Sequence, residues 1–158
     1  MAPHSWLICW FAPEPWFEVI YRELNNAGFE TTRLCGMWPK PYGQSKRPET
    51  NLANSYEMFF YAWKGRPALN KPGRKNVFDD VPPIPANQKT HPTERPIELM
   101  RQIYETFAFP GSRLLIPFLG SGNGLIAAHS LGLSAVGFEL GKSHKDSFLI
   151  KVHGMENK

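Results

Sequence analysis

The hydrophobic positions in the first 63 residues form short runs, which are separated by residues typical of turns. The continuous apolar run 6–11 predicts a buried strand, which a proline-containing stretch at 12–15 ends. Apolar residues then recur at helical spacing from Trp16 to Leu24, and the turn sequence 25–28 closes this helix. Residues 29–38 and 56–63 are rich in β-forming side chains and predict two more strands, with a polar loop over 41–55 between them.

The rest of the chain returns to a strand–helix alternation after a long proline- and lysine-rich excursion at 64–91. One apolar helical face runs from Ile97 to Phe107, after Pro96 at an early helical position. The pattern then predicts a strand at 113–116, a glycine-rich turn at 119–124, a helix at 125–131, a strand at 134–138 and a last short strand at 148–152. Strands that alternate with helices predict an α/β layered fold with a mostly parallel sheet.

Length and composition are those of one globular domain. The 158 residues are 42% hydrophobic and 20% charged, and no apolar stretch approaches the roughly 18 residues that a membrane span needs. The start lacks the basic region of a signal peptide. Cys9 and Cys35 lie in apolar runs and predict buried free thiols in a reducing compartment. We expect a single domain over 1–158, with halves at 5–63 and 91–152 and a loop at 64–90 between them.

The net charge of +4 is unevenly distributed along the chain. Residues 1–37 carry a net charge of −2, residues 38–75 carry +6, and residues 76–158 carry none. A phosphate-rich partner would exploit such a basic middle segment.

A glycine-rich turn and a distant acid form the first chemical signal. Gly120 and Gly122 follow the predicted strand 113–116, and Glu139 follows the next strand, 17 residues after Gly122. Glycines let a ligand approach the backbone, and an acid at a strand end can accept two ribose hydroxyls. The plain alternative is a tight turn with a solvated glutamate. The second signal, His91-Pro-Thr-Glu-Arg-Pro96, reads alone as a helix start with Thr93 as N-cap.

Together these motifs carry a resemblance to a known family. His91–Pro96, then Pro117-Phe-Leu-Gly-Ser-Gly-Asn123, then Gly137-Phe-Glu-Leu140 resemble the DNA N6-adenine and N4-cytosine methyltransferases, and phage-encoded members in particular. The resemblance covers about residues 5–152, and it implies a three-layer, Rossmann-like class I methyltransferase sheet that binds S-adenosylmethionine. It also implies a cytoplasmic protein that acts on double-stranded DNA, by methyl transfer to an exocyclic amine of a flipped base.

The resemblance also assigns residues to the cofactor. The methionine end would be lined by His91, Pro92, Thr93, Arg95 and Pro96. The glycine-rich segment would wrap its amino-acid and sugar portions, through Pro117, Phe118, Leu119, Gly120, Ser121, Gly122 and Asn123. Glu139 would hold the ribose, and Leu140 would lie against the adenine ring.

The sequence departs from the family pattern in two places that matter. Ile116 stands where the family usually has aspartate, which removes a carboxylate near the cofactor's ammonium group. The catalytic tetrapeptide, Asp/Asn/Ser-Pro-Pro-aromatic, is not in the sequence. Glu14, Pro15 and Trp16 are the weak candidates for a degenerate version. The alternative is that the chain begins after the catalytic strand. A second chain would then supply this strand, or the two strands on either side of the gap, 5–11 and 113–118, would close on each other. A homo-oligomer is the other expected assembly.

Eight cations in the basic segment, interleaved with aromatic residues such as Trp38, are the candidate DNA contacts: Lys40, Lys46, Arg47, Lys64, Arg66, Lys71, Arg74 and Lys75. The plain alternative is a solvated loop beside a strand whose alternate aromatics face the core. The five histidines show no metal-ligand spacing, so no metal is expected.

We therefore predict an S-adenosylmethionine-dependent DNA methyltransferase in a short or split form. The alternatives are an inactive methyltransferase-derived module that binds DNA, cofactor or a partner subunit, and a regulator that sequesters the cofactor.

Overall fold

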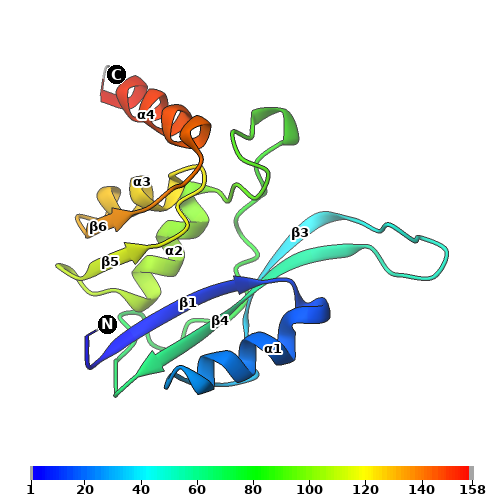
Figure 1. Ribbon diagram of the computed structural model, residues 1–158, viewed down its shortest axis with the longest axis horizontal. Coiled ribbons are helices and arrows are strands. Elements are labelled where there is room, and N and C mark those ends of the chain that lie inside the picture. The colour runs from blue at the N-terminus through cyan, green and yellow to red at the C-terminus, as the bar shows by residue number, and fades with distance from the viewer. Residues whose placement is uncertain (1, 157–158) are drawn as a thin grey trace. The chain divides into compact units, whose positions relative to one another are not determined.

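The computed structural model describes residues 2–156, which form two compact units (Figure 1). The first unit holds the chain up to residue 68 together with residues 73–82, and the second holds residues 69–72 and the chain from residue 83 onward. The expectation of one domain over the whole chain stays a prediction. No helix within the described residues is long and apolar enough to cross a membrane.

The first unit is built on a four-stranded antiparallel sheet with β4 at its centre. Its strands are β1 (Ser5–Phe11), β2 (Glu30–Thr31), β3 (Gly36–Gln44) and β4 (Asn54–Lys64). The strands β1, β2 and β3 all pair with β4 and run against it. The prediction of mostly parallel pairing is therefore wrong for this unit. Because β4 follows β3 with no helix between them, the chain lacks the crossover that a parallel neighbour needs.

One face of this sheet packs against α1 (Pro13–Asn26). Strand alternation turns Phe60 and Ala62 toward the helix, and neither side chain is exposed to solvent. The ring of Phe60 stacks on Phe11 with 4.4 Å between centroids. Cys35 belongs to this core as a free, buried thiol, as predicted, whereas Cys9 is free but only half-buried. The predicted strands at 6–11 and 56–63 and the helix between them are confirmed.

The opposite face of β3 and β4 is covered by residues 73–82, part of the predicted loop. The N–H of Met37 donates to the carbonyl of Asn76, and the carbonyl of Met37 accepts the N–H of Phe78, each at 2.8 Å, so Met37 lies beside Val77. The indole N–H of Trp38 donates to the carbonyl of Val81 at 2.8 Å, and Trp38 is 1% exposed. Trp38 is therefore a core residue rather than a base-stacking one, as the plain alternative held.

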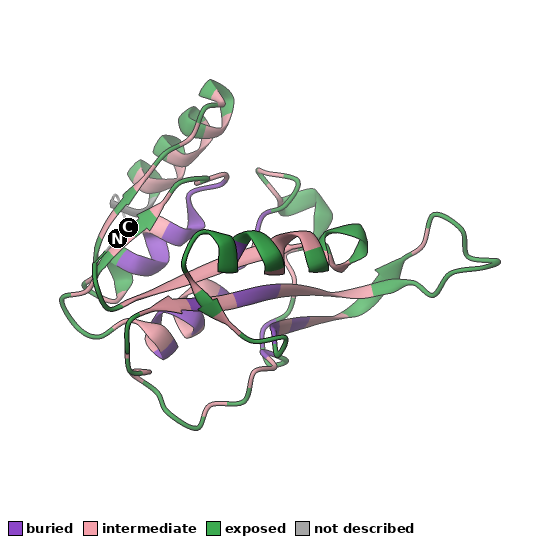
Figure 2. Cartoon of the chain, turned by 60° about the horizontal axis from the view of Figure 1, so that its bottom comes forward, coloured by how far each residue is buried: buried purple, intermediate pink, exposed green. Residues whose placement is uncertain are grey.

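The strand β3 is longer than predicted, because residues 41–44 belong to it rather than to a loop. Pro39 and Pro41 are tolerated there because, within the described residues, β4 is the one named strand beside β3, and the bridge of Met37 to Val77 on the other side ends before the prolines. Figure 2 shows the outer part of the β3–β4 hairpin in green, as exposed residues.

Within the described part of the chain, the second unit holds a two-stranded parallel sheet and three α-helices. Its elements are the short 3₁₀ helix η1 (Ala86–Gln88), α2 (Ile97–Phe107), β5 (Arg113–Ile116), α3 (Asn123–Ser130), β6 (Ser134–Gly137) and α4 (Lys142–Glu156). The strands β5 and β6 are parallel, with Leu115 opposite Val136. Leu99 and Ile103 of α2 and the alanines of α3 are fully buried. The predicted helices and strands over 97–138 are confirmed.

Two local predictions in this unit are wrong. Residues 148–152 lie inside α4, because helical spacing places Phe148 over the glycine-rich turn and Lys151, about one turn later, on the carboxylate of Glu94. Thr93 does not cap α2, since the residue before that helix is Pro96 and no side chain caps it.

Candidate functional site

The glycine-rich turn joins β5 to α3 and depends on two left-handed glycines. Gly120 has φ of +59° and Gly122 has φ of +79°, a region that other residues rarely adopt. A Cβ atom on Gly122 would lie 2.0 Å from a ring carbon of Phe148, so no side chain fits. The N–H of Leu119 donates to the carbonyl of Phe138 at 2.8 Å, which fixes the turn beside the end of β6.

Glu139 follows β6 and holds this turn with its carboxylate. One carboxylate oxygen accepts the N–H of Gly120 at 2.8 Å, and the other accepts the N–H of Gly141 at 2.7 Å. The hydrogen bonds from Gly141 and Gly120 lower the pKa of Glu139, and the nearby rings of His144 and His91 lower it further. The carboxylate is therefore ionised at neutral pH.

His91 lies against the same turn. Its ring would be 3.6 Å from a Cβ atom placed on Gly120, and its centroid is 4.4 Å from that of His144. The backbone N–H of Thr93 donates to Nδ1 of His91 at 3.2 Å. Because Nδ1 accepts this hydrogen bond, a neutral His91 carries its proton on Nε2, where it can donate to a ligand.

Glu94 organises the segment behind His91 from a buried position. Glu94 is 6% exposed, and its carboxylate accepts hydrogen bonds from Thr90, His91, Asn123 and Lys151. Burial alone would raise the pKa of Glu94, but the hydrogen bonds from Lys151 and Thr90 outweigh it and lower the pKa. An ionised glutamate therefore joins the His91 segment to α3 and α4.

Three residues near the site are not among the predicted site residues: Glu94, His144 and Lys151. Glu94 lies inside the His91–Pro96 motif, but no local signal marks it as a buried acceptor, because its donors come from separate segments of the chain. Lys151 and His144 were missed because residues 148–152 were predicted as a strand, which hid their helical spacing.

A cavity of about 300 Å³ opens beside the glycine-rich turn. It is lined by Leu119, Gly120, Leu125, Gly137, Phe138, Glu139, Lys145, Phe148 and Leu149. Apolar walls with one ionised carboxylate and accessible glycine backbone suit a ligand that has a flat apolar part and hydroxyl groups. The volume lies at the lower end of the range for small-molecule sites.

The structure brings together His91, Gly120 and Glu139, as the predicted cofactor site requires. The amide of Asn123 is hydrogen-bonded to Glu94, to the Arg95 carbonyl and to Lys151, and the residue is 5% exposed, so a contact between Asn123 and the cofactor stays a prediction. The other predicted cofactor-binding residues differ in their exposure to solvent. Exposed residues are Pro92, Thr93, Pro117, Phe118 and Leu140; half-buried residues are Arg95 and Leu119; buried residues are Pro96, Ser121 and Gly122. Their contacts with a cofactor stay predictions.

Ile116, which replaces the family aspartate, points into the unit. A Cβ atom on Gly124 would lie 3.1 Å from the Cδ1 atom of Ile116. The side chain at this position therefore packs on the start of α3 and offers no charge to a ligand.

The weak catalytic candidates lie at the beginning of α1. Glu14, Pro15 and Trp16 are exposed there, with Trp16 51% exposed, directly after the carboxyl end of β1. An aromatic ring at that place can stack on a base, so the catalytic role of this segment stays a prediction.

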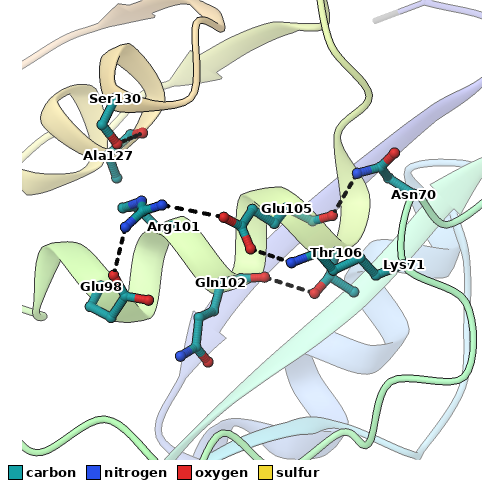
Figure 3. Close-up of polar contacts among 9 residues, drawn as sticks. All are labelled: Asn70, Lys71, Glu98, Arg101, Gln102, Glu105, Thr106, Ala127 and Ser130. Carbon is teal, nitrogen blue, oxygen red and sulfur yellow. Dashed lines mark hydrogen bonds and ion pairs between the residues drawn. The ribbon is translucent and has the colours of Figure 1, made fainter.

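The eight predicted DNA-contacting cations differ in how far the protein itself neutralises them. Lys40 pairs with Glu57 and Lys75 with Asp79, each at 2.6 Å, and Lys71 pairs with Glu105 (Figure 3). Lys64 lies over the ring of Phe29 and Arg74 over the ring of Phe78. Within residues 2–156, three have no acidic or aromatic partner: Lys46, Arg47 and Arg66.

A glycine-rich turn and an ionised acid at the carboxyl ends of adjacent parallel strands are typical of α/β proteins that bind a nucleoside-containing cofactor. A family model for N6/N4 enzymes, described as DNA methylase, matches residues 8–151. The chain therefore belongs to the N6/N4 DNA methyltransferase family, as the motifs predicted.

Two curated relatives have the same sequence identity to this chain. The type II methyltransferase M.MjaI of Methanocaldococcus jannaschii is 34% identical over 156 residues, which cover 80% of this chain and 50% of that protein. YubD of Escherichia coli K12 is 34% identical over 85 residues, which cover 54% of this chain and 36% of that protein. The chain thus spans half or less of the length of these relatives.

Solved structures of methyltransferases share the fold. The complex of M1.HpyAVI with SAM matches with a TM-score of 0.81 at 20% identity, over 96% of this chain and 76% of that one. The cytosine-N4-specific PvuII DNA methyltransferase matches with a TM-score of 0.68 at 14% identity, over 98% of this chain and 68% of that one. The predicted α/β methyltransferase fold is confirmed.

Proposed function

We propose that this chain is the cofactor-binding part of an S-adenosylmethionine-dependent DNA methyltransferase, which methylates an exocyclic amine of adenine (N6) or cytosine (N4). The observation that carries the proposal is the ionised Glu139 carboxylate, held at the glycine-rich turn by Gly120 with His91 alongside. Family membership supplies the reaction class.

The residues present fit the cofactor. Each oxygen of Glu139 accepts one backbone N–H and keeps capacity for a second hydrogen bond, which suits two ribose hydroxyls. Phe138 and Leu149 offer apolar walls for an adenine ring. When bound, S-adenosylmethionine supplies an electrophilic methyl group on its sulfonium.

The chain's own residues bind and orient rather than react. Glu139 fixes the sugar, and Nε2 of His91 donates toward the ligand. Glu94 holds the His91 segment against α3. Ile116 offers no carboxylate to the ammonium group, so the methionine end is held less tightly than an aspartate would hold it. Positioning of this kind accounts for much of the catalysis in direct transfer between two bound groups.

The group that accepts the amine proton comes from outside the recognised motifs. The family tetrapeptide is not among the 158 residues, and the exposed Glu14, Pro15 and Trp16 segment is the substitute within the chain. The alternative source is a strand from a second, different chain. Within residues 2–156, β1 of the first unit is paired on one side only, by β4, and β5 of the second unit is paired only by β6. Open strand edges of this kind accept another strand.

Because these 158 residues do not include the tetrapeptide, a second candidate function is also tested. A methyltransferase-derived module that binds DNA, cofactor or a partner subunit without turnover would need the cofactor site but no proton acceptor. Labelled methyl transfer to double-stranded DNA separates the two, because only the enzyme transfers label from a bound cofactor.

The first experiment is calorimetric titration of the full chain with S-adenosylmethionine, beside Glu139→Ala and the matched control Glu98→Ala. Glu98 is an exposed acid in the same unit, far from the turn in sequence. Loss of charged hydrogen bonds should weaken binding by about tenfold or more in Glu139→Ala and leave the control unchanged. Equal binding by both variants would refute the site, and no binding by the parent chain would refute the cofactor.

A further inference from the structure

The first unit holds a cavity of its own, of about 610 Å³, which the proposed function does not use. Its lining includes three aromatic rings and two opposite charges, from Trp6, Glu30, Tyr61, Trp63 and Arg66. None of these residues lines the cavity beside the glycine-rich turn. A volume of this size lies within the range of small-molecule sites.

The antiparallel sheet brings the acid and the rings onto one face. Glu30 of β2 and Trp6 of β1 both pair with Trp63 of β4, one from each side. Residues that pair directly across neighbouring strands project to the same face of a sheet. Tyr61 also projects to this face, because the alternate residues of β4 turn toward α1. An exposed carboxylate therefore lies beside one indole ring, and a second indole lies on the other side of that ring.

The three rings meet at steep angles rather than in a stack. The ring centroids of Trp6 and Trp63 are 5.8 Å apart with 64° between the planes, and those of Trp6 and Tyr61 are 6.5 Å apart with 55° between the planes. The indole N–H of Trp6 donates to the carbonyl of Ala68 at 3.1 Å, which holds this ring in place. All three residues are half-buried at the cavity. Angled rings of this kind form the walls of an aromatic cage, the arrangement that holds alkylated ammonium groups by cation–π attraction.

The two charges at the cavity are not paired with each other. Glu30 and Arg66 are exposed, and neither forms an ion pair within residues 2–156. The backbone N–H of Arg66 donates to Nδ1 of His4 at 3.0 Å, which fixes the segment that carries the guanidinium. The carboxylate favours a cationic group beside the rings, and the guanidinium favours an anionic group at its own side of the cavity.

We propose that this cavity binds a small organic zwitterion, whose alkylated ammonium group lies in the aromatic cage beside Glu30 and whose carboxylate pairs with Arg66. Alkyl groups suit the cage because they pack on the ring faces while the ring quadrupoles attract the charge. The inference goes beyond the proposed function and does not rest on it, because the glycine-rich turn and Glu139 belong to the second unit.

The test titrates the full chain with three probes and follows the indole N–H signals by NMR at constant ionic strength. Glycine betaine carries both charges, tetramethylammonium carries the cation alone, and tert-butylacetate has the shape of glycine betaine with carbon in place of nitrogen. We expect glycine betaine to bind at least about fivefold more tightly than either of the other probes. Equal binding of glycine betaine and tert-butylacetate would overturn the proposal, because the cavity would then recognise shape and not charge. A parent chain that does not bind glycine betaine would also overturn it.

Two charge variants test the two ends of the ligand separately. Glu30→Gln should weaken the binding of glycine betaine and tetramethylammonium by about threefold, while the matched control Glu23→Gln, at an exposed acid of α1, should change little. Arg66→Gln should weaken the binding of glycine betaine but strengthen that of tetramethylammonium, because it removes an attraction for one probe and a repulsion for the other. A disturbed fold would weaken both. Parallel losses in Arg66→Gln, or a loss in Glu30→Gln no larger than in the control, would refute the assignment.

A third variant removes one wall of the aromatic cage. Trp63→Leu should weaken the binding of glycine betaine by about threefold or more, whereas Tyr42→Leu, at a ring that is 59% exposed in the same unit, should leave it unchanged. The S-adenosylmethionine affinity of Trp63→Leu should equal that of the parent, because the cofactor cavity is lined by other residues. Competition between S-adenosylmethionine and glycine betaine would assign this cavity to the cofactor and overturn the proposal. Loss of S-adenosylmethionine binding in Glu139→Ala, with glycine betaine binding intact, would support two separate sites.

Discussion

Replacing Glu94 by glutamine tests how the site is held together. The carboxylate accepts five hydrogen bonds, three on one oxygen from Thr90 and His91 and two on the other from Asn123 and Lys151. A glutamine has the same shape but only one oxygen. In either orientation of the amide, its NH₂ group faces N–H or O–H donors and cannot accept a hydrogen bond from them.

The structure sets the expected magnitude. The Glu94 side chain is 4% exposed and the Lys151 side chain 24%, so this pair is largely shielded from water. Breaking a buried pair from one side costs about 3–5 kcal/mol, and we expect Glu94→Gln to lower the free energy of unfolding by that amount. Lys151→Met leaves four donors on the carboxylate and should cost about 1.5–3 kcal/mol. The double variant should cost less than the sum, since it removes a donor that faces the glutamine.

The assay is urea unfolding of each variant between neutral and acidic pH, with the exposed Glu98→Gln as control. The pKa of Glu94 is lowered in the folded state, so its stabilisation is complete above the unfolded pKa of about 4.5 and is lost as pH falls through the folded value. The advantage of the parent over Glu94→Gln should therefore be constant near pH 7 and shrink below about pH 4.5. A cost no larger than that of Glu98→Gln, or one that does not change in acid, would refute this account.

Two further variants or reagents probe other parts of the fold. Gly122→Ala should lower the free energy of unfolding by about 2–4 kcal/mol, because it combines a left-handed backbone with a clash against Phe148. Gly132 also has a left-handed backbone, with φ of +66°, but a Cβ atom there meets open space. Gly132→Ala should therefore lower the free energy of unfolding by only about 1–2 kcal/mol. Equal losses in thermal unfolding would contradict the clash. Burial raises the pKa of Cys35 to about 11, so at pH 8 only about a thousandth of it is thiolate and iodoacetamide should label it far more slowly in the native chain than in denaturant. Comparable labelling rates by mass spectrometry would show that the thiol is not buried.

The amino-acid sequence by itself determined the local elements and the family. Apolar runs and helical spacing depend on a few neighbouring residues, so β1, α1, β4, α2, β5, α3 and β6 could be predicted from them. The glycine-rich turn and Glu139 could be found because a left-handed turn and an acid at a strand end leave a short, specific signature.

The tertiary structure alone decided what each element contacts. The antiparallel register of β3 on β4, the prolines in that strand and the helical state of residues 148–152 all depend on partners far away in the sequence. The same holds for Glu94, whose donors come from three separate segments, and for Asn123, whose amide those contacts use. Which cations face solvent also follows from the fold, because an ion pair such as Lys40 with Glu57 joins residues that only the sheet brings together. Local propensity acts over a few residues, whereas burial and charge pairing act between surfaces that exist only after folding.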